Sequence, residues 1–151
     1  MNEQRRHKLR SIESRLAILE AKDEIRELTA HYCHAVADGD AVTVLSLFCE
    51  DGVFRTGDLV STGRAELRKL FVSIEGRTYK PFIQNHVIEL LDENHASGRC
   101  SVEIRALLNG EAYTLAGYYI DQYRRTDGRW RFAERHYIEY HNVPWREGWK
   151  A

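Results

Sequence analysis

Two turn signals in the second half of the chain constrain the fold more than any other feature. Asn109-Gly110 and Asp127-Gly128 each separate two long runs that are rich in β-branched and aromatic residues. Such dipeptides tolerate the positive φ angles that a tight hairpin requires at both central positions. We therefore predict a four-strand antiparallel meander after Pro81, formed by residues 82–91, 97–108, 111–124 and 129–141.

The first part of the chain carries a helical pattern instead. Apolar residues recur at spacings of three and four in residues 9–19 and again in residues 25–36. This pattern predicts either two helices or one helix with an extension, ending at the polar turn 38–40. Residues 1–11 are basic and weakly patterned, which predicts a flexible N-terminal arm.

Two shorter helices and a small hairpin are predicted between these parts. Asp40 is placed to cap a second helix that carries Val44 and Phe48 on its apolar face. Residues 53–60 resemble a hairpin that turns at Gly57-Asp58, and Thr62-Gly63 opens a third helix that stops near Gly76.

Helices followed by a meander indicate an α+β fold. The 151 residues are expected to form a single domain over 1–151, because the composition shows no break. Covering one face of a curved sheet with three helices produces a cone whose mouth can hold a small molecule.

Composition excludes several classes of function. A net charge of −1 lacks the basic excess of a nucleic-acid binder. No run approaches the roughly 20 apolar residues of a membrane span, so no membrane contact is expected. Three widely spaced cysteines, Cys33, Cys49 and Cys100, indicate reduced thiols and a cytoplasmic location. No metal-ligand spacing and no phosphate-binding loop occurs, so we expect neither a metal nor another cofactor.

Three segments resemble a known family. They are YCHAVADGD at 32–40, Asn85-His86 at the start of the first long strand, and GYYIDQYRRTDGRW at 117–130. With the element order, these segments resemble the nuclear transport factor 2-like (NTF2-like), or SnoaL-like, superfamily. The branch that they resemble contains scytalone dehydratase, bile acid 7α-dehydratase and γ-hexachlorocyclohexane dehydrochlorinase. The resemblance implies an NTF2-like cone with three N-terminal helices on a curved antiparallel sheet.

The resemblance also implies a catalytic pair, His86 and Asp38. Histidine exchanges a proton near neutral pH, and a carboxylate can orient its ring. In this branch the histidine removes a proton from a carbon next to an activating group. The residues alone leave another interpretation open, in which His86 is an ordinary strand histidine and Asp38 serves only the turn. Cys33 stands where the relatives have a catalytic lysine or tyrosine.

Further site residues are expected around this pair. Arg135 is expected to stabilise a departing group or an enolate-like oxygen, with an outward arginine on the sheet as the alternative. Tyr32 and Tyr119 are candidate substrate-binding hydroxyls, and Phe54 and Trp130 are candidate apolar walls.

The function expected from these features is a cofactor-independent dehydratase, lyase or isomerase acting on a small apolar cyclic or polyketide-like substrate. Two alternatives are a non-catalytic ligand-binding or assembly module and a relative of the small subunit of ring-hydroxylating dioxygenases. The resemblance further implies a homo-oligomer, a trimer or a dimer, for which apolar residues on both faces of the strands supply an interface.

Overall fold

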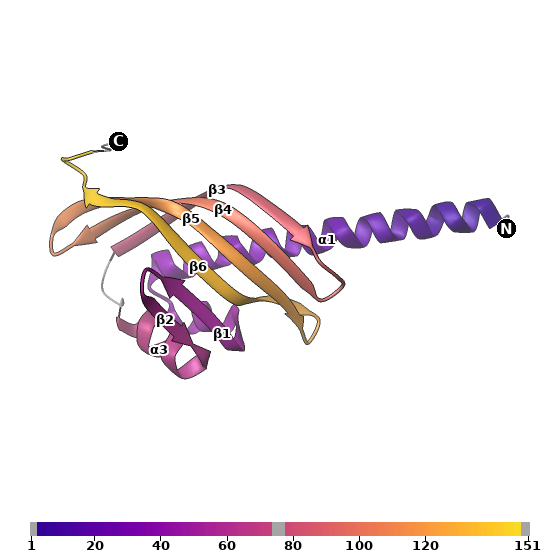
Figure 1. Ribbon diagram of the computed structural model, residues 1–151, viewed down its shortest axis with the longest axis horizontal. Helices are drawn as coiled ribbons and strands as arrows, with labels where there is room; N and C mark the ends of the chain where they lie inside the picture. The colour runs from indigo at the N-terminus through magenta and orange to yellow at the C-terminus, as the bar shows by residue number, and fades with distance from the viewer. Residues whose placement is uncertain (1–2, 74–77, 149–151) are drawn as a thin grey trace.

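A computed structural model describes residues 3–73 and 78–148, with backbone only for residues 3–10. This described part of the chain is α+β, with three helices and one sheet of six strands (Figure 1). The elements are α1 (Glu3–Asp38), α2 (Ala41–Ser46), β1 (Phe48–Thr56), β2 (Leu59–Thr62), α3 (Gly63–Ser73), β3 (Thr78–Leu90), β4 (His95–Leu108), β5 (Glu111–Thr126) and β6 (Arg129–Pro144).

Helix α1 is continuous, which confirms the prediction of one helix with an extension and not two separate helices. It is 36 residues long, or about 54 Å at 1.5 Å per residue. Figure 1 shows its C-terminal half beneath the sheet and its N-terminal half extending past the sheet, where residues 11–20 are all exposed. The helix includes most of the segment 1–11; the flexibility of that segment stays a prediction.

The predicted meander is confirmed. Strands β3 to β6 pair antiparallel in chain order, and both glycine turns lie where the sequence places them. The sheet as a whole is mixed, however, because β1 lies parallel to β6. The strand order is β2-β1-β6-β5-β4-β3, so β3 is an edge strand and tolerates Pro81, which cannot donate a ladder hydrogen bond.

The short helices confirm most of the remaining predictions. The Asp40 side chain caps α2 by accepting a hydrogen bond from the Thr43 amide at 2.9 Å. The prediction that Phe48 belongs to α2 is wrong, because Phe48 begins β1. At the preceding residue, the Leu47 carbonyl already accepts a sheet-like hydrogen bond from the Phe132 amide. Gly76, the predicted end of α3, lies outside the described residues.

The core fills the cone between α1 and the sheet. Its centre is aromatic, with Tyr32 of α1 in edge contact with the rings of Phe48, Phe71, Tyr119 and Phe132 at centroid distances of 5.6–6.2 Å. In the described part of the chain, no helix is long and apolar enough to cross a membrane.

Candidate active site

A β-bulge in β3 turns His86 toward the interior. Gln84 pairs with Ser101 and Val87 pairs with Arg99, so two residues, Asn85 and His86, lie opposite one. Asn85 absorbs the extra residue with a φ of 53°, a left-handed conformation that asparagine adopts more readily than most residues. Beyond the bulge the inward positions are His86, Ile88 and Leu90, whereas before it they are Tyr79 and Ile83.

His86 is the first member of a hydrogen-bonded chain. Its Nε2 lies 3.1 Å from the Tyr123 hydroxyl, which donates to Asp121 Oδ2 at 2.8 Å. Because the hydroxyl proton goes to the carboxylate, we assign the proton of the neutral imidazole to Nε2, which donates to Tyr123. This assignment leaves the Nδ1 lone pair available as a base.

Arg135 anchors the other end of the chain. It forms a two-pronged ion pair with Asp121, with Nε–Oδ1 and Nη2–Oδ2 distances of 2.9 Å, and both side chains are 0% exposed. The guanidinium also lies over the rings of Tyr32, Tyr119 and Phe132 at 3.9–4.3 Å from the centroids. The predicted alternative of an outward arginine is therefore wrong.

A second bulge is what places Arg135 inside. Trp130 and Phe132 face the core, and strict alternation would continue inward at Glu134 and outward at Arg135. The pairing of β5 with β6 shifts between Tyr123 and Gln122, so that Ala133 is the extra residue and Arg135 lies opposite Asp121. Without this shift, Asp121 would face Glu134, a residue of like charge.

A glycine in the neighbouring strand makes room for Tyr123. A Cβ at Gly98 would lie 2.9 Å from Tyr123 Cε2 and 3.2 Å from its hydroxyl oxygen. The missing side chain therefore lets the tyrosine ring lie across β4 and reach His86.

Replacing Gly98 tests this placement. We expect Gly98→Ala to displace the Tyr123 ring, break the His86–Tyr123 hydrogen bond and cost about 1–3 kcal/mol of stability through overpacking. The shifts of the His86 ring nitrogens in NMR spectra and the chemical denaturation midpoint measure the two effects. Ser97→Ala, at the next position in β4, is the control. Unchanged His86 nitrogen shifts in Gly98→Ala would contradict the role given to the glycine.

Burial keeps His86 neutral. Desolvation lowers the pKa of the imidazole below its usual value, and the nearby Arg135 and Arg26 charges lower it further, against the opposing effect of Asp121. The buried Tyr123 hydroxyl has its pKa raised, mainly by desolvation, and so stays protonated. At neutral pH the hydrogen-bonded chain therefore consists of the neutral His86 imidazole, the Tyr123 phenol and the Asp121 carboxylate, which is paired with Arg135.

The predicted contact between Asp38 and His86 is not formed. Asp38 is the last residue of α1 and is exposed, and in the described part of the chain no hydrogen bond joins it to His86. It lies six positions after Tyr32 in the helix, a rotation of about 240° from the buried face. Asp121, reached through Tyr123, is the carboxylate that the fold brings to the histidine.

All four predicted substrate-binding residues are part of the core. Tyr32 and Tyr119 are 3% exposed and Phe54 is 9% exposed, and all three pack against other aromatic rings. Their contact with a substrate stays a prediction. Cys33 is also buried, which raises the pKa of its thiol to about 11 and keeps it protonated at neutral pH.

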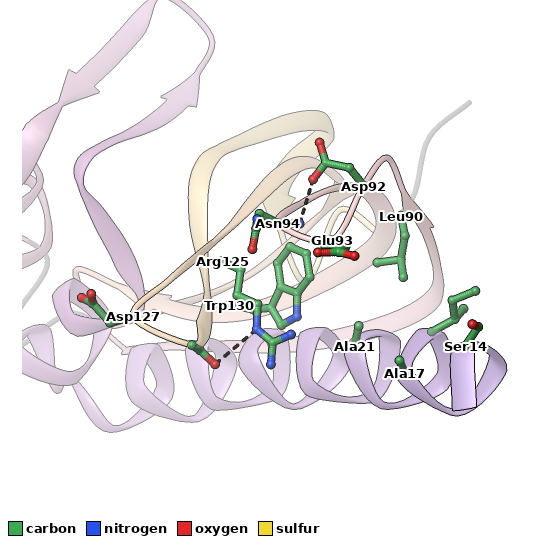
Figure 2. A pocket seen from close by; sticks show the side chains of 12 residues that line it. Ser14, Ala17, Ala21, Leu90, Asp92, Glu93, Asn94, Arg125, Asp127 and Trp130 are labelled. Carbon is green, nitrogen blue, oxygen red and sulfur yellow. Dashed lines mark hydrogen bonds between the residues drawn. The ribbon is translucent and has the colours of Figure 1, made fainter. Parts of the chain in front are cut away.

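Trp130, the fourth, also lines a cleft of about 770 Å³ at one end of the cone. The cleft lies between α1 and the turns that join β3 to β4 and β5 to β6 (Figure 2). His86 is not among its lining residues. In the described part of the chain, no group of three or more His, Cys, Asp and Glu side chains could hold a metal ion.

Asp121 and Tyr123 are the site residues that the sequence analysis missed. Both lie within the segment 117–130 that carries the family resemblance, at alternate positions of one strand. Their i, i+2 spacing places them on one face of β5 and could have drawn attention to them. Their link to Arg135 depended on a bulge that no local signal marked.

The comparison with known families decides the classification of this fold. The SnoaL-like domain family matches residues 17–136. The chain belongs to the SnoaL-like family. Within the NTF2-like superfamily, this SnoaL-like protein has solved structural neighbours, whereas no curated protein matches it.

Three of these structures illustrate the range of the neighbours. A candidate scytalone dehydratase from Novosphingobium aromaticivorans DSM 12444 is 21% identical, with 84% of this chain and 89% of that chain covered and a TM-score of 0.79. The hexachlorocyclohexane dehydrochlorinase LinA-type3 from Novosphingobium barchaimii LL02 is 18% identical, with 85% and 92% covered and a TM-score of 0.78. A candidate aromatic ring hydroxylase from Novosphingobium aromaticivorans is 25% identical, with 83% and 94% covered and a TM-score of 0.78.

Proposed function

We propose that this SnoaL-like protein is a cofactor-independent lyase that eliminates water from a small, mostly apolar cyclic or polyketide-like substrate. The observation that carries the proposal is the chain from His86 through Tyr123 to Asp121, which ends on the Arg135 guanidinium. It provides a neutral base together with a buried charge that orients it. Two distant structural neighbours, a candidate scytalone dehydratase and a dehydrochlorinase, support the same class of reaction.

His86 is the base in this proposal. Its Nδ1 removes a proton from a carbon next to a carbonyl, the C–H electron pair forms the new double bond, and hydroxide departs from the adjacent carbon. The proton taken by His86 and the departing hydroxide together make the water that is released. As the imidazolium forms, the Asp121 carboxylate stabilises it through Tyr123.

Arg135 acts here as a positioning residue. It is fully buried and bound to Asp121, so it holds the carboxylate in place beneath Tyr123. The orienting role that the sequence analysis gave to Asp38 belongs to Asp121 in this proposal.

The first test is a substrate screen. A panel of cyclic hydroxy-ketones is added to the protein, ligands that raise the melting temperature are selected, and each is assayed for the appearance of the conjugated enone. The proposal requires at least one compound that is both stabilising and dehydrated. Stabilisation without turnover throughout the panel would contradict it.

The pH dependence of kcat/KM provides the second test. Because burial lowers the pKa of His86 and only the neutral imidazole can take a proton, activity should rise with pH through that lowered pKa and level off above it. On the free enzyme, the inflection should fall below the usual histidine value of about 6.5. If kcat/KM rises only above about pH 6.5, the base is not the buried His86.

A second candidate function is a non-catalytic ligand-binding or assembly module. The observation in its favour is that aromatic rings fill the interior beside Arg135, while the 770 Å³ cleft lies elsewhere. The candidate ring hydroxylase among the neighbours supports a relative of the dioxygenase small subunit within this class. Failure of the whole panel to turn over would favour this function.

We also propose that the protein is a homo-oligomer that associates through the outer face of its sheet. Large apolar side chains are exposed along β3 to β6, among them Val87 at 70% and Tyr140 at 57%. Light scattering at micromolar concentration measures the state, and a monomer would contradict the proposal.

A further inference from the structure

A buried donor without an acceptor lies in the wall of the cleft at the end of the cone. Trp130 is 5% exposed, and its indole Nε1 is buried without a hydrogen-bond partner in the described part of the chain. An unsatisfied buried N–H costs roughly 1–3 kcal/mol, so buried donors normally have an acceptor. Figure 2 shows the nitrogen-bearing edge of the indole turned toward α1, with the Arg125 guanidinium drawn beside it in this view.

The rest of the cleft has a wide apolar wall and an acidic rim. Helix α1 contributes small side chains, Ala17 and Ala21, and β3 contributes Leu90, so the walls of the cleft around the indole are apolar. The volume of about 770 Å³ lies in the range of small-molecule sites, which is roughly 300–1,000 Å³.

Charges on the rim select against anions. Asp92 is occupied by the amides of Asn94 and His95, whereas Glu93 and Asp127 also line the cleft. The cation in the lining, Arg125, donates to the Gly128 carbonyl and lies 3.8 Å from Glu24. The net charge of the rim is therefore negative.

We propose that this cleft binds an uncharged, mostly apolar ring compound whose carbonyl oxygen accepts a hydrogen bond from Trp130 Nε1. The site is separate from His86, because Ile88 lies between His86 and Leu90 among the inward-facing residues of β3, and His86 does not line the cleft. It therefore does not rest on the proposed lyase activity.

The experiment follows the indole N–H resonances in ¹H–¹⁵N spectra while the protein is titrated with 1-tetralone, a neutral bicyclic ketone. We expect saturable movement of the Trp130 signal, which Trp130→Phe identifies by its loss. Trp130→Phe keeps a ring in place and removes the donor, so tetralone should bind about two- to tenfold more weakly to it. Trp145→Phe, at an exposed tryptophan, should bind like the parent protein.

Two further variants separate the cleft from other sites. Ala17→Phe fills the cleft from the exposed face of α1 and should abolish saturable binding, whereas Glu20→Phe places the same ring outside the lining and should not. In His86→Gln the Trp130 signal should still saturate at the same tetralone concentration, so failure of the lyase proposal leaves this result unchanged. The anion 2-naphthoate should bind more weakly than tetralone.

Three outcomes would overturn the inference. They are unaltered binding to Ala17→Phe, tighter binding of naphthoate than of tetralone, and movement of the Trp130 signal with protein concentration before any ligand is added. The last outcome would show that a second copy of the chain covers the cleft.

Discussion

Asp121→Asn is expected to lower the free energy of unfolding by about 3–5 kcal/mol, because it leaves the Arg135 cation buried without a counter-charge. For a chain of this size, the loss corresponds to a fall of roughly 6–20 °C in melting temperature. The asparagine keeps the shape of the side chain, so the loss reports charge and not packing. Chemical denaturation followed by circular dichroism measures it.

Two further variants provide a control and a rescue for this result. Glu111→Gln breaks the exposed ion pair with Arg146 and should change stability by no more than about 1 kcal/mol. The double variant Asp121→Leu/Arg135→Met replaces the buried pair with apolar side chains and should recover most of the loss, because neither charge is left alone. An Asp121→Asn variant as stable as Glu111→Gln would show that Arg135 does not depend on its partner.

His86→Gln is expected to lower turnover of an identified substrate by about 10²-fold or more, because it removes the base while keeping a side chain of similar size. His86 is half-buried on an edge strand, so the variant should fold. The rate of enone formation under saturating substrate gives kcat, and melting temperature verifies the fold.

His34→Gln is the matched control, since His34 is an exposed histidine of α1. Tyr123→Phe provides a second comparison, because it keeps the ring and removes the hydroxyl that links His86 to Asp121. Its loss should be non-additive with that of His86→Gln, because the two residues act as a unit. A His86→Gln variant that turns over substrate at the parent rate would contradict the proposed mechanism but not the assigned fold.

The turns and the helix cap could be predicted from the sequence. Asn109-Gly110 and Asp127-Gly128 specify hairpins through the φ angles of two adjacent residues, and Asp40 caps α2 through the third residue after it. These are local constraints, so the order of the helices and the antiparallel meander followed from them. The parallel pairing of β1 with β6 did not, because it joins segments about 80 residues apart.

The site depended on tertiary structure because two bulges interrupt the alternation on which a sequence interpretation rests. The period of two would point Glu134 inward and leave Arg135 outside; one extra residue at Ala133 reverses this. The bulge at Asn85 similarly separates His86 from the face that Gln84 occupies. The family resemblance named His86 and Arg135 as candidates, but their partner Asp121 was fixed by the register of strands that pair across the sheet.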